Sequence, residues 1–569
     1  MAHPSMMLAR ALLASVVEST RAGHRWVGCR YESCAMTKAI SKLYLLAITL
    51  VAVIQLLMEA DLVVLACLYV VSACAVLVFE RKVIRAPDVI YFLFVIYYGL
   101  FSLVVKTVLA QPVDENLTSP LNTSLALFLG FASITIGYLL ARGQTRFKLT
   151  YQFEQNLNHK KTLEWCSLVF FPIGIVFETL HVLLRPVAEV SSAATEGGIG
   201  MFGTFAFVTT FAVVCEASLV FDKNGRSSRG IGRLALMLLV ILALGIAGNV
   251  KQSFLMNFAA VIVVVVVNAN RINLWREAIG GGLLAFLLIF YVSPAIHITR
   301  GQAKTMPVMD RIELAEDVLA KADYNPFTLQ EQLSLTLADI GVSKNPAYNY
   351  FFPQTGNYDR FAMIQPINVV VTGWESLGAM DAYDAFQDLG NLLPSFLVGE
   401  KTVVASVDRI AWYYGYRKEP IIGRPVMGIV TSSIAVGGIV GALLLTGPFI
   451  WLMFWLLDKL CGPLKHNVTG LFLTSVMLLT VEGDLASLFA TFSRQMPIIL
   501  AFLWGVNVLI KFLPSSVGDV SPGPNSGPGR GQASGPGSAP GPHSGLGPRS
   551  GPGHGAELGQ QGLRRSRLL

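Results

Sequence analysis

The chain has 569 residues, of which 53% are hydrophobic and 14% charged, and its mean hydropathy is +0.57. Soluble proteins contain about 45–50% apolar and about 25% charged residues, so this composition excludes an ordinary soluble globular protein. The formal net charge of +7 does not indicate a nucleic-acid partner, because most lysines and arginines lie in short connections between apolar runs. Composition therefore predicts a protein that crosses a membrane many times.

The chain begins with a basic stretch, residues 1–42, that has no signal-peptide cleavage pattern before the apolar run at Leu43. We interpret it as a cytoplasmic extension. A hydrocarbon core about 30 Å thick needs about 20 apolar residues in a helix, and the apolar runs predict about twelve such spans. They lie near residues 43–58, 62–79, 89–109, 122–140, 162–184, 201–221, 234–249, 252–268, 278–296, 428–457, 468–483 and 485–511.

The spans divide the chain into blocks. Residues 43–296 hold nine of them and residues 428–512 hold three, separated by a long polar loop at 297–427 that has room for helices of its own. Residues 513–569 are rich in Gly, Pro and Ser and have few apolar side chains to bury, so this tail is expected to be disordered and dispensable for activity. The predicted fold class is an all-α polytopic membrane protein with one large helical loop.

Alternate connections carry the positive charge, in the segments around 81–85, 142–161, 223–233, 271–276 and 459–465. The positive-inside rule assigns these connections, and both termini, to the cytoplasm. The opposite side then holds the short segment 111–121, the segment 185–200, a tight turn at Lys251 and the long loop. The long loop is therefore predicted to lie outside the cytoplasm.

Several common sites are missing from the sequence. It has no P-loop, dinucleotide-binding glycine pattern, HExxH motif or nucleophile elbow, and none of the seven cysteines lies in the long loop. No cofactor or metal is therefore expected. What remains is a set of basic residues predicted near the outer membrane face.

An anionic headgroup is the natural ligand for this set. Arginine forms bidentate hydrogen bonds to phosphate and lysine adds a point charge, so the residues suit a diphosphate at the bilayer surface. The alternative is that basic side chains at span ends reach lipid headgroups, and for Lys418 simple surface charge also serves. The candidate diphosphate ligands are Lys251, Arg300, Arg360, Arg409, Lys418 and Arg424.

Three residues near this set are candidates for proton transfer: His297, Asp359 and Glu375. A structural role is the alternative for each. Arg494 lies inside a predicted span, and we expect it to pair with Glu482 or Asp484.

The order of several segments resembles a known family. AGNVKQSFLMN, YVSPAIHITRG, YDRFAMIQPINVV, LLPSFLVGEK, RKEPIIG and SSIAVGGIVGALLLTGP follow one another as in bacterial oligosaccharide repeat-unit polymerases of the O-antigen polymerase type. The resemblance covers roughly residues 40–512. Lys251 stands where that family commonly has arginine, which weakens bidentate phosphate contact there.

The resemblance implies a metal-independent glycosyltransferase with an architecture similar to the glycosyltransferase C superfamily. Its implied location is a bacterial inner (cytoplasmic) membrane, with the large helical loop in the periplasm. It would transfer a growing glycan from undecaprenyl diphosphate to a new lipid-linked repeat unit, with a chain-length regulator and a flippase as partners. Arg300, Arg360 and Lys251 would stabilise the departing diphosphate, and His297 or a carboxylate would activate the acceptor hydroxyl.

Other functions remain open from the sequence. An O-antigen ligase would use the same donor with a different acceptor, and a scaffolding subunit would have no turnover. A secondary transporter or flippase of lipid-linked glycan fits twelve spans, but predicts internal repeats and polar sites at the bilayer midplane.

Overall fold

The computed structural model describes residues 32–143, 147, 150, 156–157, 159–188, 205–222, 225–226, 228–248, 251–268, 287–303, 306, 308–339, 349–352, 359–386, 405–417 and 425–512. All of them belong to one compact unit, Met1–Leu513. The predicted disorder of the tail and most of the predicted N-terminal extension lie outside the described residues.

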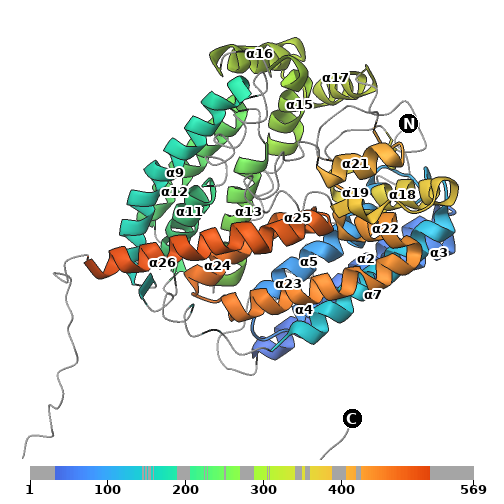
Figure 1. The fold of residues 1–569 in the computed structure, drawn as a ribbon, viewed down its shortest axis with the longest axis horizontal. Helices are drawn as coiled ribbons and strands as arrows, with labels where there is room; N and C mark the ends of the chain where they lie inside the picture. Colours follow the sequence, from blue (N-terminus) through green and yellow to red (C-terminus); the bar gives the residue numbers. More distant parts are fainter. Residues whose placement is uncertain are drawn as a thin grey trace, which may run out of the picture. The chain divides into compact units, whose positions relative to one another are not determined.

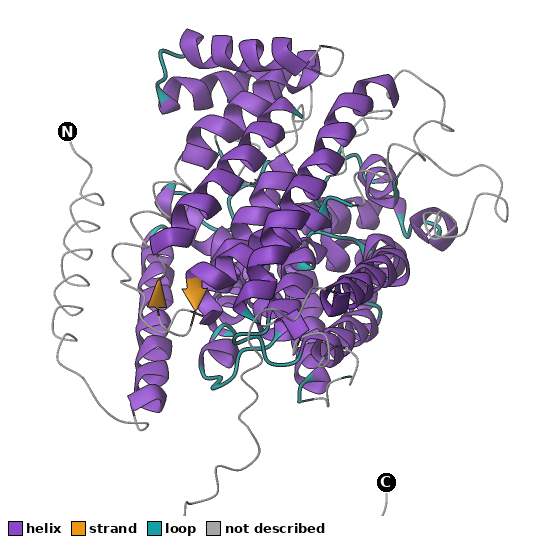
Figure 2. Cartoon of the chain, turned by 90° about the vertical axis from the view of Figure 1, so that its left-hand side faces the viewer, coloured by secondary structure: helices purple, strands orange, loops and turns teal. Residues whose placement is uncertain are grey.

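Helices make up most of the described chain. In the first half they are α2 (Glu32–Leu57), α3 (Leu62–Ala73), α4 (Val76–Phe79), α5 (Ala86–Val95), the π-helix η1 (Ile96–Leu100), α6 (Phe101–Val108), α7 (Pro120–Ala141), α9 (Lys160–Ala188), α11 (Phe207–Val220), α12 (Ser228–Ala247) and α13 (Lys251–Asn268) (Figure 1). The strands β1 (Phe221–Asp222) and β2 (Gly225–Arg226) pair antiparallel as a short hairpin (Figure 2).

The second half contains the long loop and the last spans. The π-helix η2 (Leu288–Val292) lies in the predicted span 278–296, and α15 (Ser293–Ala303) runs from that span into the loop. The rest of the loop region holds α16 (Val308–Lys321), α17 (Pro326–Asp339), the 3-10 helix η4 (Asp359–Phe361), α18 (Ile364–Leu377), α19 (Ala382–Phe386) and α21 (Ser406–Tyr413). The last part comprises α22 (Gly428–Leu444), α23 (Thr446–Cys461), α24 (Val468–Val476), the 3-10 helix η6 (Leu478–Val481), α25 (Leu485–Ala490), the π-helix η7 (Thr491–Gln495) and α26 (Met496–Phe512).

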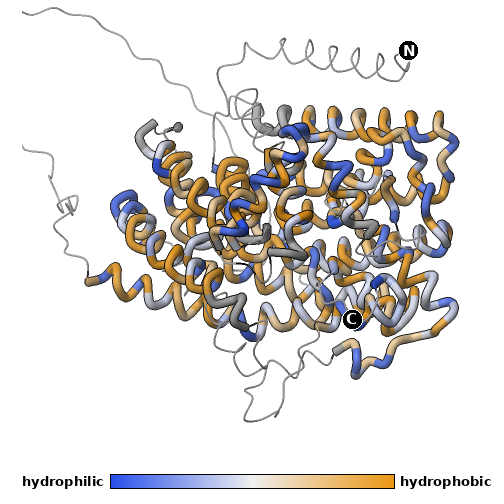
Figure 3. Tube along the Cα trace, turned by 90° about the horizontal axis from the view of Figure 1, so that it is seen from above, coloured by the Kyte–Doolittle hydropathy of each residue, from blue (hydrophilic) through white to orange (hydrophobic). Residues whose placement is uncertain are grey.

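The structure contains apolar helices of membrane-spanning length, as expected for a polytopic membrane protein. Among the described residues, seven helical stretches are long and apolar enough to cross a membrane, and a bent pair raises this to as many as eight. Along the traced chain these stretches are predominantly hydrophobic (Figure 3). The seven are Lys38–Leu57, Leu62–Phe79, Ala86–Val108, Pro120–Ala141, Lys160–Leu183, Gly230–Ala247 and Leu485–Phe512.

The other predicted spans differ from expectation. Three correspond to shorter apolar helices, Phe207–Val220, Phe254–Asn268 and Val468–Val481. Much of the predicted span at 278–296 lies outside the described residues. The segment predicted as a span over 428–457 is a bent pair of helices, because α22 and α23 meet at an angle of 64°, and Gly438 within α22 has non-helical dihedral angles.

Helix α7 organises one side of the bundle, with α22 and α23 lying along it (Figure 1). Small residues allow this close approach: a Cβ on Gly130 would lie 2.4 Å from a methyl of Val430, and one on Gly137 would lie 3.0 Å from the Trp451 nitrogen. Ser133 lies on α7 less than one turn after Gly130, and its hydroxyl donates to the Leu443 carbonyl. Val430 and Leu443 are thus 13 residues apart in the chain but contact neighbouring positions of α7. The chain between Val430 and Leu443 therefore leaves α7 and returns to it before α23 begins.

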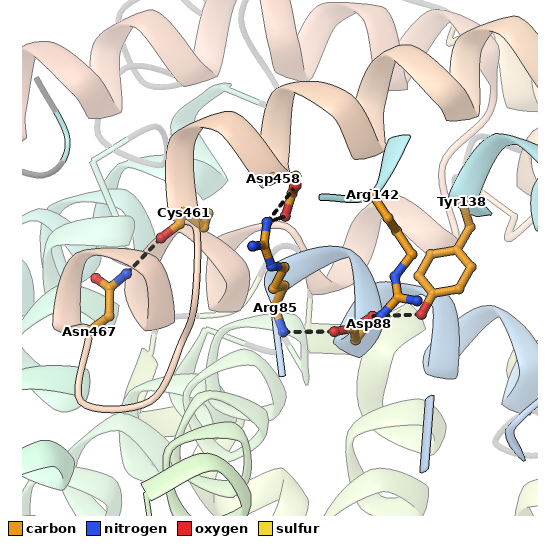
Figure 4. Close-up of polar contacts among 7 residues, drawn as sticks. All are labelled: Arg85, Asp88, Tyr138, Arg142, Asp458, Cys461 and Asn467. Carbon is orange, nitrogen blue, oxygen red and sulfur yellow. Dashed lines mark hydrogen bonds and ion pairs between the residues drawn. The ribbon is translucent and has the colours of Figure 1, made fainter. Parts of the chain in front are cut away.

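Connections assigned to the same side from their charge lie together. At one end, Arg85 binds Asp458 at 2.8 Å and Arg142 binds Asp88 at 2.8 Å, and Asp88 also accepts from the Tyr138 hydroxyl (Figure 4). At the other end, Asn368 of the long loop accepts hydrogen bonds from the 111–121 segment and from the start of α7.

Candidate functional site

The centre of the candidate site is a break in the last part of the chain, between η6 and α25. The Asp484 carboxylate caps α25 by accepting the Ser487 N–H at 2.8 Å, so the new helix starts there. Glu482, just before it, is left outside both helices with its side chain 11% exposed. Its carbonyl accepts the N–H of Gly428, which joins this break to the start of α22.

A second irregularity brings Tyr97 to the same place. A π-helix, in which one extra residue widens the turn, leaves the Tyr97 carbonyl available to the Met363 N–H at 3.0 Å. The Tyr97 hydroxyl donates to Glu482 Oε1 at 2.8 Å. The π-turn therefore positions Tyr97 to bind both the long loop and the break.

Arg360 completes the cluster from η4. Its Nε donates to Oε1 and Oε2 of Glu482 at 3.0 and 2.9 Å, and its Nη2 also donates to Oε2. The Arg360 side chain remains 41% exposed. We call Tyr97, Arg360 and Glu482 the Arg360 cluster.

Arg360 stays protonated in this environment. Burial lowers the pKa of its guanidinium, but the hydrogen bonds and charge of Glu482 outweigh burial and raise the pKa above its usual value. Because Glu482 uses the Nε and Nη2 atoms, the guanidinium still has the edge formed by Nη1 and Nη2. That edge has the geometry for a bidentate contact with an oxyanion.

Aromatic and close backbone packing hold the cluster rigid. The Phe361 ring meets those of Tyr97 and Phe101, each with centroids 5.2 Å apart. Gly428 has a φ of +72°, and a Cβ there would lie 2.9 Å from both Met363 Sδ and the Tyr98 hydroxyl. A larger residue at position 428 would therefore be strained and would have to displace these side chains.

Other predicted residues lie at some distance from this cluster. Glu375 accepts from Asn122 Nδ2 at 2.5 Å and from the Ser119 hydroxyl at 3.3 Å, so it links α18 to the 111–121 segment. Glu375 lies near the far end of α18, about 16 Å along the helix from its first residue, Ile364. Arg409, half-buried on α21, is nearer, since Ser406 on the same helix donates to the Asp484 carboxylate.

A second group of predicted residues belongs to a separate set of helices. His297 and Arg300 lie on α15, which packs on η2, α16 and α17 (Figure 1). Lys251 begins α13, and Arg311 of α16 donates to the Ala247 carbonyl at the end of α12, close in the chain to Lys251. The side chains of Lys251, Arg300 and Asp359, and all of Lys418 and Arg424, lie outside the described residues.

Sequence reasoning missed the partners of Arg360. The predicted pairing of Arg494 with Glu482 or Asp484 is wrong, because Glu482 binds Arg360 and Tyr97 while Asp484 caps α25 and accepts from Ser406. Arg494 is exposed within η7. The signal for Glu482 was a carboxylate between apolar segments, which indicates a functional or paired residue.

In the part of the chain that the structure describes, no group of three His, Cys, Asp or Glu residues is placed to hold a metal ion. Comparisons with protein-family models, curated proteins and solved structures found no match. The functional argument therefore depends on the chain's own residues.

Proposed function

We propose that this protein is a membrane glycosyltransferase that polymerises undecaprenyl-diphosphate-linked oligosaccharide repeat units into a surface polysaccharide at the periplasmic face. The observation that carries this proposal is Arg360, which is held by Glu482, itself bound by Tyr97, yet has a side chain that is 41% exposed and a second guanidinium edge with the geometry for an oxyanion. The resemblance of the segment order to O-antigen polymerases supports it.

In the proposed reaction, the acceptor hydroxyl oxygen bonds to the anomeric carbon of the donor glycan as the bond from that carbon to the diphosphate oxygen breaks. Undecaprenyl diphosphate leaves with the bonding electrons, and the hydroxyl proton passes to a base. Arg360 stabilises the charge that develops on the diphosphate, with Arg300 and Lys251 as further cations. His297 or a carboxylate is the proposed base.

Glu482 has a positioning role in this proposal. It holds the plane of the guanidinium so that little ordering is needed when the diphosphate arrives. Because its negative charge also offsets that of Arg360, the pair is nearly neutral. Strong diphosphate binding then needs the additional cations.

The test is reconstitution of the purified protein with a lipid-linked repeat unit, followed by separation of products by length. The full chain should give a ladder. Arg360→Ala should slow extension by roughly 30-fold to 1,000-fold, equivalent to about 2–4 kcal/mol. Arg360→Lys should retain only part of the wild-type rate, because lysine cannot form the bidentate contact of a guanidinium. Arg300→Ala should have a similar effect.

Lys321→Ala is the matched control, since it removes an exposed cation from the same loop, one that pairs with Asp317 on its own helix. It should leave the ladder unchanged. A wild-type ladder from both Arg360→Ala and Arg300→Ala would reject the site. A full chain that forms no polymer while the repeat unit is intact would reject the function.

A secondary transporter or flippase of lipid-linked glycan is the second candidate. The observation favouring it is the pair of discontinuous helices, α22 to α23 and α24 to α25, because transporters often build substrate sites at such breaks. Liposomes separate the two functions. A flippase would move the lipid-linked unit across the bilayer without lengthening it, whereas a polymerase lengthens it in detergent, where no compartments exist.

A further inference from the structure

An apolar groove of about 460 Å³ lies between α23 and α26, and no residue of the Arg360 cluster lines it. The volume is within the range of about 300–1,000 Å³ that is typical of small-molecule sites. Every lining residue except Thr150 is apolar. The lining residues are Phe147, Thr150, Leu456, Leu460, Phe492, Met496, Pro497 and Leu500.

The groove lies between two membrane-crossing segments. α26 belongs to the span Leu485–Phe512, and α23 is the second half of the bent pair. Leu452 of α23 and Trp504 of α26 are 48% and 59% exposed, which marks these helices as facing the bilayer. Hydrocarbon chains are the medium there, so a lipid chain is the occupant that the groove's chemistry fits.

One end of the groove carries a positive charge. The Lys459 ammonium lies 5.7 Å from the ring centroids of both Phe147 and Trp455, and Phe147 lines the groove. The Phe147 N–H donates to the Lys459 carbonyl at 3.0 Å, and the Thr150 hydroxyl donates to the Phe147 carbonyl at 3.0 Å. These bonds fix the end of the groove next to the cation.

We propose that this groove is a binding site for an anionic phospholipid, with an acyl chain between α23 and α26 and the headgroup phosphate beside Lys459. Lysine and aromatic residues at a span end are typical of the level at which headgroups lie. A lysine near the membrane surface favours an anionic lipid by about five-fold. This proposal is independent of the proposed glycosyltransferase activity.

The first test uses the full-length protein in bilayer discs made of phosphatidylcholine and phosphatidylglycerol in equal amounts. Lipids that remain bound after transfer to detergent are identified by native mass spectrometry. The unsubstituted protein should retain more phosphatidylglycerol than phosphatidylcholine, and Lys459→Gln should reduce the ratio of the two about five-fold. Lys511→Gln, which removes an exposed cation in the last turn of α26 that does not line the groove, is the matched control and should lower the preference less than Lys459→Gln does.

The second test fills the groove. Leu500→Trp places an indole in the space for the acyl chain and should lower retention of either lipid, whereas Leu452→Trp, on the exposed face of α23, should not. Leu456→Phe serves if Leu500→Trp fails to accumulate. Equal retention of both lipids by the unsubstituted protein, or wild-type retention in both the Lys459 and groove variants, would overturn the proposal.

Discussion

At the scale of single residues, the Arg360 cluster has two explanations that predict different outcomes. If the ion pair only stabilises the fold, removing one charge destabilises the protein, and removing the second charge as well restores both stability and activity. A substrate-binding arginine is needed even when its partner is neutral. Glu482 is 11% exposed, so leaving it charged without Arg360 has a cost in either case.

A double substitution separates these explanations. Arg360→Ala alone should destabilise the protein by about 1–2 kcal/mol, discounted because the Arg360 side chain is 41% exposed. Adding Glu482→Gln should recover most of that stability, because the remaining amide still accepts from Tyr97. Chain extension should stay low in the double variant. Thermal unfolding in detergent and the product ladder measure the two effects.

Glu482→Gln alone is the control for this experiment. It keeps the arginine and should reduce extension less than Arg360→Ala does. If the double variant regains both stability and polymer length, Arg360 is a structural residue, and the search for diphosphate ligands moves to Arg300 and Lys251.

The sequence was informative about Arg360 but not about its environment. A basic residue beside the apolar segment FAMIQPINVVV stands out in a linear reading, and it became a candidate for that reason. Tyr97 and Glu482 lie far from it in the chain, and nothing in a single sequence pairs residues across such separations. Glu375 was singled out from the same stretch, yet it binds Asn122 rather than joining Arg360.

At the scale of elements, the main feature is the interruption of α22 at Gly438. The break leaves the Ala435 carbonyl without its helical donor, and that carbonyl instead accepts from the Met380 N–H at 2.8 Å and the Tyr414 hydroxyl at 3.0 Å. Within a membrane protein, irregular backbone persists only where such bonds are made inside the protein. The long loop is therefore part of what keeps α22 broken.

Gly438 should be intolerant of any side chain. Its φ is +62°, and a Cβ there would lie 2.8 Å from the Trp374 ring. Gly438→Ala should destabilise the protein by on the order of 1–3 kcal/mol, because the alanine favours a continuous helix and collides with the indole. Thermal unfolding in detergent measures this.

Gly505→Ala is the matched control, because Gly505 lies within α26 and a Cβ there meets nothing within 4 Å. It should be neutral or stabilise the protein by up to about 1 kcal/mol. Equal stability of the two variants would show that the break at Gly438 needs no glycine.

Span positions were easier to predict than breaks. The spans predicted at 122–140 and 62–79 correspond to the helical stretches Pro120–Ala141 and Leu62–Phe79 in the structure. They could be predicted because the length of an apolar run is read directly from consecutive residues. The run SSIAVGGIVGALLL reads as one continuous apolar segment, and its kink depends on Trp374 and Tyr414 from elsewhere in the chain. The π-turn at Tyr97 likewise has no sequence signal.

At the scale of the molecule, the connections sort into two sets. The contacts of Arg85 with Asp458 and of Arg142 with Asp88 close one end of the bundle (Figure 4), and those of Asn368 with Thr118 and Thr123 join the long loop to the other. The same grouping follows from counting lysines and arginines. For these connections, the grouping predicted from charge agrees with the contacts.

The remaining prediction assigns these two ends to opposite sides of the membrane. Val83, 51% exposed in a basic connection, and Tyr383, 70% exposed in the long loop, are suitable for replacement by cysteine. In cells with a permeable outer membrane and an intact inner membrane, an impermeant maleimide should label Tyr383→Cys at once and Val83→Cys only after the inner membrane is opened. The unsubstituted chain gives the background from its native cysteines. Immediate labelling of Val83→Cys together with protection of Tyr383→Cys would invert the topology and place the Arg360 cluster in the cytoplasm, where a periplasmic polymerase has no use for it.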